Sequence, residues 1–180
     1  MIINRPLVLD ACCLINIHAS GRMSEILEAL PVQIHVAETV REQELRQLQK
    51  LDALNPVGER FSNLLDRNVI WVADFENEAE QIAFLNYAAA IGDDGEAASF
   101  AIAEARAFAV ATDDKKARRF ATSELPDLHL FYTLDLVEHW MSVRTPSLDE
   151  VRQVLYSIRD HGSYFPGPSH PLRAWWDAHL

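Results

Sequence analysis

Acidic residues recur in this chain at the places where short apolar segments end. They form four clusters: Asp10, the group Glu38/Glu42/Glu44, the group Asp93/Asp94/Glu96, and the pair Asp113/Asp114. Carboxylates gathered at one site repel one another at neutral pH, and a fold that collects them usually collects a divalent cation as well. Because Mg²⁺ and Mn²⁺ prefer oxygen ligands, the clusters predict a metal centre that hydrolyses phosphodiester bonds.

Each cluster also has a purely structural explanation. Asp is a favoured N-cap residue, and an acid in the first turn of a helix interacts well with the helix dipole. Asp10, Glu38 and Asp113 all stand at positions suited to such a role. One cluster alone favours that explanation, but four clusters that follow successive apolar segments favour a shared site.

The second cluster leaves the choice of acid open. Glu38 and Glu42 are four residues apart and therefore share one face of the predicted helix. Glu38 falls in the first turn, where a structural role suffices to explain it. We take Glu42 as the site residue, with Glu38 and Glu44 as alternatives.

Strands that alternate with helices position these clusters. Short apolar or β-branched segments predict strands at 6–10, 32–36, 68–75, 108–112 and 128–134. Helix-forming segments predict helices at 11–20, 24–30, 38–54, 76–92, 96–107, 114–124 and 135–143, with a break at 55–58. This order predicts a three-layer α/β/α sandwich around a mainly parallel sheet. Ligands of such sheets bind beyond the carboxyl ends of the strands, which is where the acids fall.

The length of 180 residues fits one domain with a small terminal appendage. We expect the domain to span residues 1–144 and an extension to span residues 145–180, packed on the domain or on a partner. The extension begins with an amphipathic helix and continues as a Pro-rich, aromatic and irregular segment. Trp175 and Trp176 in that segment are expected to anchor it by packing.

Charge and hydropathy exclude some classes of function. A net charge of −11 argues against a broad basic surface for nucleic acid, although Lys and Arg cluster locally at 41–50 and 115–119. No apolar run is long enough to span a membrane. The adjacent Cys12 and Cys13 cannot support a disulfide framework, so we expect a reduced, cytoplasmic setting.

Four segments together resemble the PIN-domain family, which includes the VapC-like ribonuclease toxins. They are VLDACCLIN, the glutamate helix after VQIHV, GEAASFAIA and ATDDKKAR, and the resemblance covers about residues 6–140. It implies an acidic quartet that holds Mg²⁺ or Mn²⁺ and cleaves RNA: Asp10, Glu42, Glu96 and Asp114. At the third position Asp93 and Asp94 compete with Glu96, and Asp94 and Asp113 are expected as further metal ligands. The resemblance also implies a toxin–antitoxin pair, hence an antitoxin partner, and a homodimer.

Two other functions compete with a metal-dependent ribonuclease. The extension would suit a PIN-like scaffold that binds a protein partner and is catalytically silent. An acidic pocket would also suit a regulatory domain that accepts a phosphoryl group on an Asp, but the glutamate helix fits that class poorly.

Overall fold

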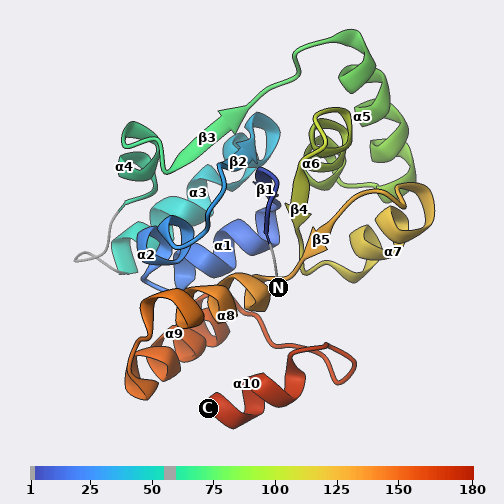
Figure 1. The fold of residues 1–180 in the computed structure, drawn as a ribbon. Helices are drawn as coiled ribbons and strands as arrows, with labels where there is room; N and C mark the ends of the chain where they lie inside the picture. The colour runs from blue at the N-terminus through green and yellow to red at the C-terminus, as the bar shows by residue number, and fades with distance from the viewer. Residues whose placement is uncertain (1–2, 55–59) are drawn as a thin grey trace.

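The computed structural model describes residues 3–54 and 60–180, and within them the chain forms one five-stranded parallel sheet. The strand order is β3-β2-β1-β4-β5 (Figure 1). The strands are β1 (Leu7–Leu9), β2 (Ile34–Ala37), β3 (Ile70–Ala73), β4 (Ala109–Ala111) and β5 (Leu130–Phe131). Because all neighbouring strands are parallel, their carboxyl ends share one edge of the sheet. The predicted strands are confirmed, each in a shorter form.

Helices cover both faces of the sheet. The helices before β3 are α1 (Ala11–Ala19), α2 (Met23–Glu28), α3 (Glu38–Leu54) and α4 (Phe61–Asp66). Those after it are α5 (Glu78–Ile91), α6 (Asp94–Ala105), α7 (Lys115–Glu124), α8 (Thr133–Arg144), α9 (Leu148–His161) and α10 (Arg173–His179). In Figure 1, α5, α6 and α7 lie on one side of the sheet, while α1 and α2 lie on the other. The predicted α/β/α sandwich is therefore confirmed.

The core explains why the first strand is so apolar. Leu7, Val8 and Leu9 are fully buried because β1 is the central strand and helices cover both of its faces. At the edge of the sheet, Trp71 and Val72 of β3 are exposed. Within the described residues, no helix combines the length and the hydropathy needed to cross a bilayer.

Two helices differ from the sequence predictions. No helix was predicted at α4, which is short, lacks a side-chain cap and is held by the buried Phe61 and Leu64. The C-terminal segment, predicted to be irregular, contains α10, which forms around a buried Trp176. The predicted break at 55–58 lies outside the described residues.

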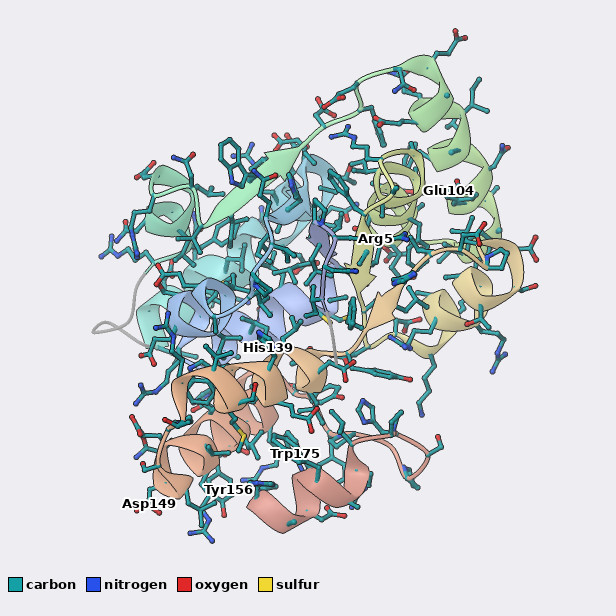
Figure 2. The ribbon with its side chains drawn as sticks, viewed as in Figure 1. Arg5, Glu104, His139, Asp149, Tyr156 and Trp175 are labelled. Carbon is teal, nitrogen blue, oxygen red and sulfur yellow. The ribbon has the colours of Figure 1, made fainter. Side chains whose placement is uncertain are left out.

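The chain after residue 144 packs back on the rest of the molecule. Helix α9 buries Val151, Val154 and Ile158 and packs against α1, and α10 packs against α9. Tyr156 of α9 donates a hydrogen bond to the carbonyl of Leu180 at 3.3 Å, on the side where Trp175 lies (Figure 2). The predicted aromatic anchor is confirmed for Trp176, which is fully buried.

Candidate active site

Asp10 directly follows β1 and is buried at the carboxyl edge of the sheet, with 1 % of its surface exposed. Its Oδ1 accepts a hydrogen bond from the backbone N–H of Ala11 at 2.7 Å, which makes Asp10 the N-cap of α1. Burial raises the pKa of the Asp10 carboxyl to about 6, and the charge of Asp93 acts in the same direction. The nearby Thr112 hydroxyl and the Ala11 N–H offset part of this rise in pKa. Asp10 is therefore a buried acid whose pKa is affected by a second acid, Asp93.

Glu96 is the most strongly perturbed acid of this edge. It lies half-buried in the first turn of α6. Burial and the charges of Asp10, Asp114 and Asp93 raise its pKa to about 8, while the charge of Lys116 lowers it. These charge effects show that four acids from three separate chain segments come together at the edge of the sheet.

Two of these acids also cap helices. Asp93 Oδ1 accepts the Glu96 N–H at 2.9 Å at the start of α6. Asp114 Oδ1 accepts the N–H groups of Lys116 and Ala117 at 2.7 and 2.8 Å at the start of α7. Within the described part of the chain, no protein donor reaches the second oxygen of either carboxylate. Each capping bond uses one carboxylate oxygen and leaves the other available to a metal ion. The structural and the metal-binding explanations of these two acids are therefore compatible.

Three helix N-termini meet at the cluster. Asp10 caps α1, Asp93 caps α6 and Asp114 caps α7. The N-terminal end of a helix carries a partial positive charge, which stabilises nearby anions by typically 0.3–1 kcal/mol each. This arrangement lets the fold tolerate several carboxylates at one place and orients them from rigid elements.

The structure separates the three glutamates of α3. Glu38 is paired with Arg41, whose Nε donates to Glu38 Oε2 at 2.7 Å. Glu42 is exposed, and it lies about 200° around the helix from the fully buried Val40, at 3.6 residues per turn. Glu44 lies on the same side as Val40, and burial together with the charge of Asp93 raises its pKa.

The face of α3 that carries Val40 packs on α6 at a glycine. A Cβ built on Gly95 would lie 3.1 Å from both Val40 Cγ2 and Gln43 Oε1, closer than such atoms ordinarily approach. The absence of a side chain at Gly95 therefore lets α3 approach the start of α6. Glu44, on the same side of α3 as Val40, is affected by the charge of Asp93, whereas Glu42 is exposed on the other side of the helix.

Asp113, expected as a metal ligand, is engaged by the protein itself. Its Oδ2 accepts a hydrogen bond from Asn16 Nδ2 at 3.0 Å and another from the Thr133 hydroxyl, and its Oδ1 accepts the Thr133 N–H at 3.1 Å. These bonds tie the end of β4 to α1 and to the start of α8. Thr133 was missed in the sequence, although its place just after β5 matches that of the acids after the other strands.

Among the described residues, Cys12, Cys13 and Asp113 are the one group of His, Cys, Asp or Glu side chains close enough to surround an ion, with ligand atoms within 4.8 Å of one another. Burial raises the pKa of the Cys13 thiol well above its usual range, so this sulfur stays protonated. Its Sγ lies 3.5 Å from Asp113 Oδ2, to which it donates. We therefore assign this trio to the hydrogen-bond network and not to a metal site.

The remaining predicted ligand, Asp94, is the first residue of α6 and is exposed. Its neighbour Asp93 is the residue whose charge reaches Asp10, Glu44 and Glu96. The sequence favours Asp93 over Asp94 as the N-cap residue, because an Asp three residues before a Glu is typical of a helix N-terminus.

The donor atoms of the acidic cluster suit a hard divalent cation, although in the described residues only Cys12, Cys13 and Asp113 already lie close enough to surround an ion. Asp10, Asp93, Glu96 and Asp114 contribute carboxylate oxygens, the ligands that Mg²⁺ and Mn²⁺ prefer. Burial is the main cause of the raised pKa values of Asp10 and Glu96, and repulsion by neighbouring acids adds to it; a bound cation would offset both effects.

Comparison with known proteins agrees with this geometry. A family model described as the PIN domain matches residues 6–168. No curated protein and no solved structure matches the chain. PIN domains are generally nucleases that use divalent metals, and the acids of this chain lie at the carboxyl edge of its parallel sheet. The match, the fold and the position of the acids together show that the chain belongs to the PIN-domain family.

Proposed function

We propose that this chain is a Mg²⁺- or Mn²⁺-dependent endoribonuclease that hydrolyses phosphodiester bonds of RNA. The observation that carries the proposal is the position of Asp10, Glu96 and Asp114 at the starts of α1, α6 and α7 around a parallel sheet, where burial and neighbouring acids raise the pKa of Glu96 to about 8. A fold that gathers carboxylates at the carboxyl edge of its sheet needs a cation to balance their negative charge.

Asp10, Glu96 and Asp114 would hold the cation, with Asp93 and Glu44 completing the acidic surround. When bound, the cation activates a water molecule and neutralises charge on the phosphate. The helices keep the carboxylates in place: Asp10 and Asp114 are fixed by their capping bonds, so their second oxygens are directed by rigid backbone. Glu96 must release its proton before it can serve as a ligand, so metal binding should strengthen as pH rises.

The test is an RNA cleavage assay on the purified chain with Mg²⁺ or Mn²⁺, in comparison with EDTA and with Asp10→Asn. We expect cleavage only with metal and only with an intact Asp10. Asp66→Asn, which alters an exposed acid of α4 away from the sheet edge, is the matched control and should cleave like the wild type. Cleavage that survives both EDTA and Asp10→Asn would contradict the proposal. Metal binding without cleavage of any RNA would favour the catalytically silent scaffold.

We also propose that the ribonuclease is the toxin of a toxin–antitoxin pair, that it acts in the cytoplasm and that it forms a homodimer. The free thiols of Cys12 and Cys13 suit a reducing compartment. Helix α5 exposes Ile82 and Leu85 by 53 % and 64 %, an apolar surface that suits a second protein chain. Co-expression with the product of the neighbouring gene tests for an antitoxin. Light scattering of the purified chain tests for the homodimer.

A further inference from the structure

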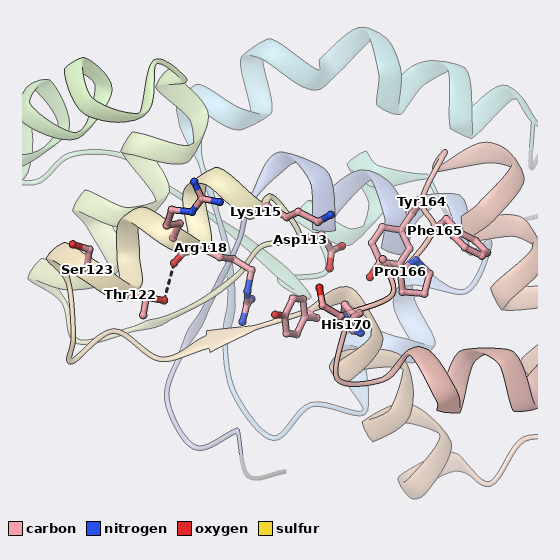
Figure 3. Close-up of a pocket in the computed structure, with 13 residues that line it drawn as sticks. Asp113, Lys115, Arg118, Thr122, Ser123, Tyr164, Phe165, Pro166 and His170 are labelled. Carbon is pink, nitrogen blue, oxygen red and sulfur yellow. Dashed lines mark hydrogen bonds between the residues drawn. The ribbon is translucent and has the colours of Figure 1, made fainter.

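A cavity of about 640 Å³ lies beside the acidic cluster, between α7 and the returning C-terminal segment 164–170. We call it the α7 cleft. Its size is within the range of sites that hold small ligands, roughly 300–1,000 Å³. Figure 3 shows Asp113 and Lys115 facing Tyr164 and His170 across it. Since Asp113 lines the cleft and Asp114 is its neighbour in the chain, a molecule in the cleft would adjoin the acidic cluster.

Two cations line the α7 cleft without a protein partner. Lys115 and Arg119 are four residues apart on α7 and share one face of that helix. In residues 3–54 and 60–180, neither side chain forms a hydrogen bond or an ion pair. The chain as a whole carries a net charge of −11 and most of its arginines are paired with acids, so two unpaired cations at one cavity indicate an anionic ligand.

Arg118, by contrast, belongs to the wall of the cleft. Its guanidinium lies 3.4 Å from the centre of the Tyr132 ring and donates to the carbonyls of Thr112 and Phe131 at 2.9 and 2.8 Å. These contacts hold the Tyr132 ring at a fixed orientation. The cleft therefore has a rigid aromatic wall beside its two free cations.

The opposite wall offers further rings. Tyr132 meets His170 at a centroid distance of 4.2 Å, and Tyr164 and Phe165 pack on the buried Trp176 at 6.1 and 6.0 Å. Phe165 remains 55 % exposed in spite of this packing. Aromatic rings next to cations are the recurrent means by which proteins bind single-stranded nucleic acid, since bases stack on the rings while phosphates meet the cations.

Two polar atoms of this wall are buried without a hydrogen-bond partner among the described residues: His170 Nε2 and the Tyr164 hydroxyl. His170 Nδ1 accepts the Leu172 N–H at 3.0 Å, which leaves the proton of the neutral ring on Nε2. The Tyr164 hydroxyl lies near Asp113, and burial together with the charge of that carboxylate raises the pKa of the phenol, so Asp113 is the group that this hydroxyl meets. His170 Nε2 is the donor that the polar edge of a base would satisfy.

We propose that the α7 cleft holds one unpaired nucleotide of the RNA substrate, with its phosphate at Lys115 and Arg119 and its base against the rings of Phe165 and Tyr164. This inference rests on the proposed ribonuclease function and adds a requirement to it. A base that is paired in a duplex is stacked within the helix and does not reach a side cavity. The requirement is that the nucleotide held in the cleft is unpaired.

The experiment measures binding of a fluorescent single-stranded oligoribonucleotide in EDTA, where the proposed cleavage is suppressed, and compares it with the duplex of the same sequence. We expect Lys115→Ala with Arg119→Ala to weaken single-strand binding about tenfold or more. The matched control is Arg46→Ala with Lys50→Ala, an equally spaced pair of exposed cations on α3, for which we expect a change of less than about threefold.

Phe165→Ala tests the base. We expect it to weaken single-strand binding roughly tenfold, within the loss typical of one base–aromatic stack, and to leave duplex binding unchanged. Phe165→Trp keeps a stacking ring and should restore binding, which guards against a loss caused by misfolding near Trp176.

Equal affinity for the single strand and the duplex, with no effect of Phe165→Ala, would overturn the proposal that the α7 cleft holds a nucleotide. A free nucleoside monophosphate that binds as tightly as the oligonucleotide would also overturn it, because the cleft would then be a site for a small molecule. If the single strand binds as expected but the wild type does not cleave it with metal, the cleft stands and the proposed activity fails.

Discussion

The carboxyl groups of Asp10 and Glu96, at the starts of α1 and α6, lie within electrostatic range of each other, and after burial the charge of Asp10 is the next cause of the raised pKa of Glu96. Asp10 is fixed as the cap of α1, and Glu96 is fixed in the first turn of α6. Folding therefore gathers like charges that would separate in an unfolded chain. A divalent cation turns this repulsion into attraction, which links metal binding to stability.

Without metal, the acidic cluster should make the fold less stable as pH rises. The pKa of Glu96 is about 8 in the folded chain against an ordinary value of 4.5, so between these values the folded state binds more protons than the unfolded state. Stability then falls as pH rises through that window. Asp10 acts with the same sign between 3.8 and about 6.

Calorimetric melting in EDTA checks this sign. We expect the melting temperature of the wild type to decrease as the pH is raised from 5 to 8. The decrease should be smaller in Glu96→Gln, whose side chain has no proton to lose in this range. Equal pH dependence in the two proteins would show that Glu96 titrates normally.

Glu44→Gln should impair the enzyme more than Glu42→Gln. Glu44 is partly buried and the charge of Asp93 contributes to its raised pKa, whereas Glu42 lies on the exposed side of α3. We expect Glu44→Gln to lower the cleavage rate at limiting Mn²⁺ by about 10-fold or more, the usual loss for a group that surrounds a metal. A larger loss in Glu42→Gln would restore the original sequence prediction.

Asn16→Ala should destabilise the edge of the sheet. Asn16 is 3 % exposed, and its Nδ2 donates to Asp113 Oδ2 at 3.0 Å, so the substitution leaves a carboxylate short of a donor. We expect a loss of about 1–3 kcal/mol in the free energy of unfolding, measured by urea denaturation. Asn86→Ala, on the exposed surface of α5, is the control and should change little. Equal effects of the two variants would mean that the bond to Asp113 adds no stability.

Trp176→Ala should release the C-terminal segment. Trp176 is fully buried and packs against Tyr164 and Phe165, so its removal should cost about 3–5 kcal/mol. Trp71→Ala removes the same side chain from a site that is 44 % exposed and should cost much less. Similar losses for the two tryptophans would show that the segment does not depend on its anchor.

Much of the fold and part of the site follow from the sequence. The strands are short apolar runs whose ends are marked by acids, and a parallel sheet brings those ends together, so Asp10, Glu96 and Asp114 could be proposed before the structure. The acid of α3 could not be chosen in this way. Spacing pairs Glu38 with Glu42, but the face that meets α6 is set by the contact between Val40 and Gly95.

Contacts between distant segments explain the other differences. Asp113 looks like a ligand in the sequence, and only the fold brings Asn16 and Thr133 to its oxygens. The α7 cleft depends on segment 164–170 returning to α7, which the burial of Trp176 secures. The Pro-rich, aromatic sequence of the C-terminal segment does not by itself predict that residues 164–170 lie next to α7.

The most direct measurement is a calorimetric titration of Mn²⁺ into the chain at pH 7, repeated in two buffers of different ionisation enthalpy. At this pH Glu96, with a pKa of about 8, holds its proton, so binding must displace it. We predict one binding event that releases about one proton in the wild type, and loss of both binding and proton release in Asp10→Asn. Binding of equal strength in Asp10→Asn, or binding with no proton release, would contradict a metal centre built from these acids.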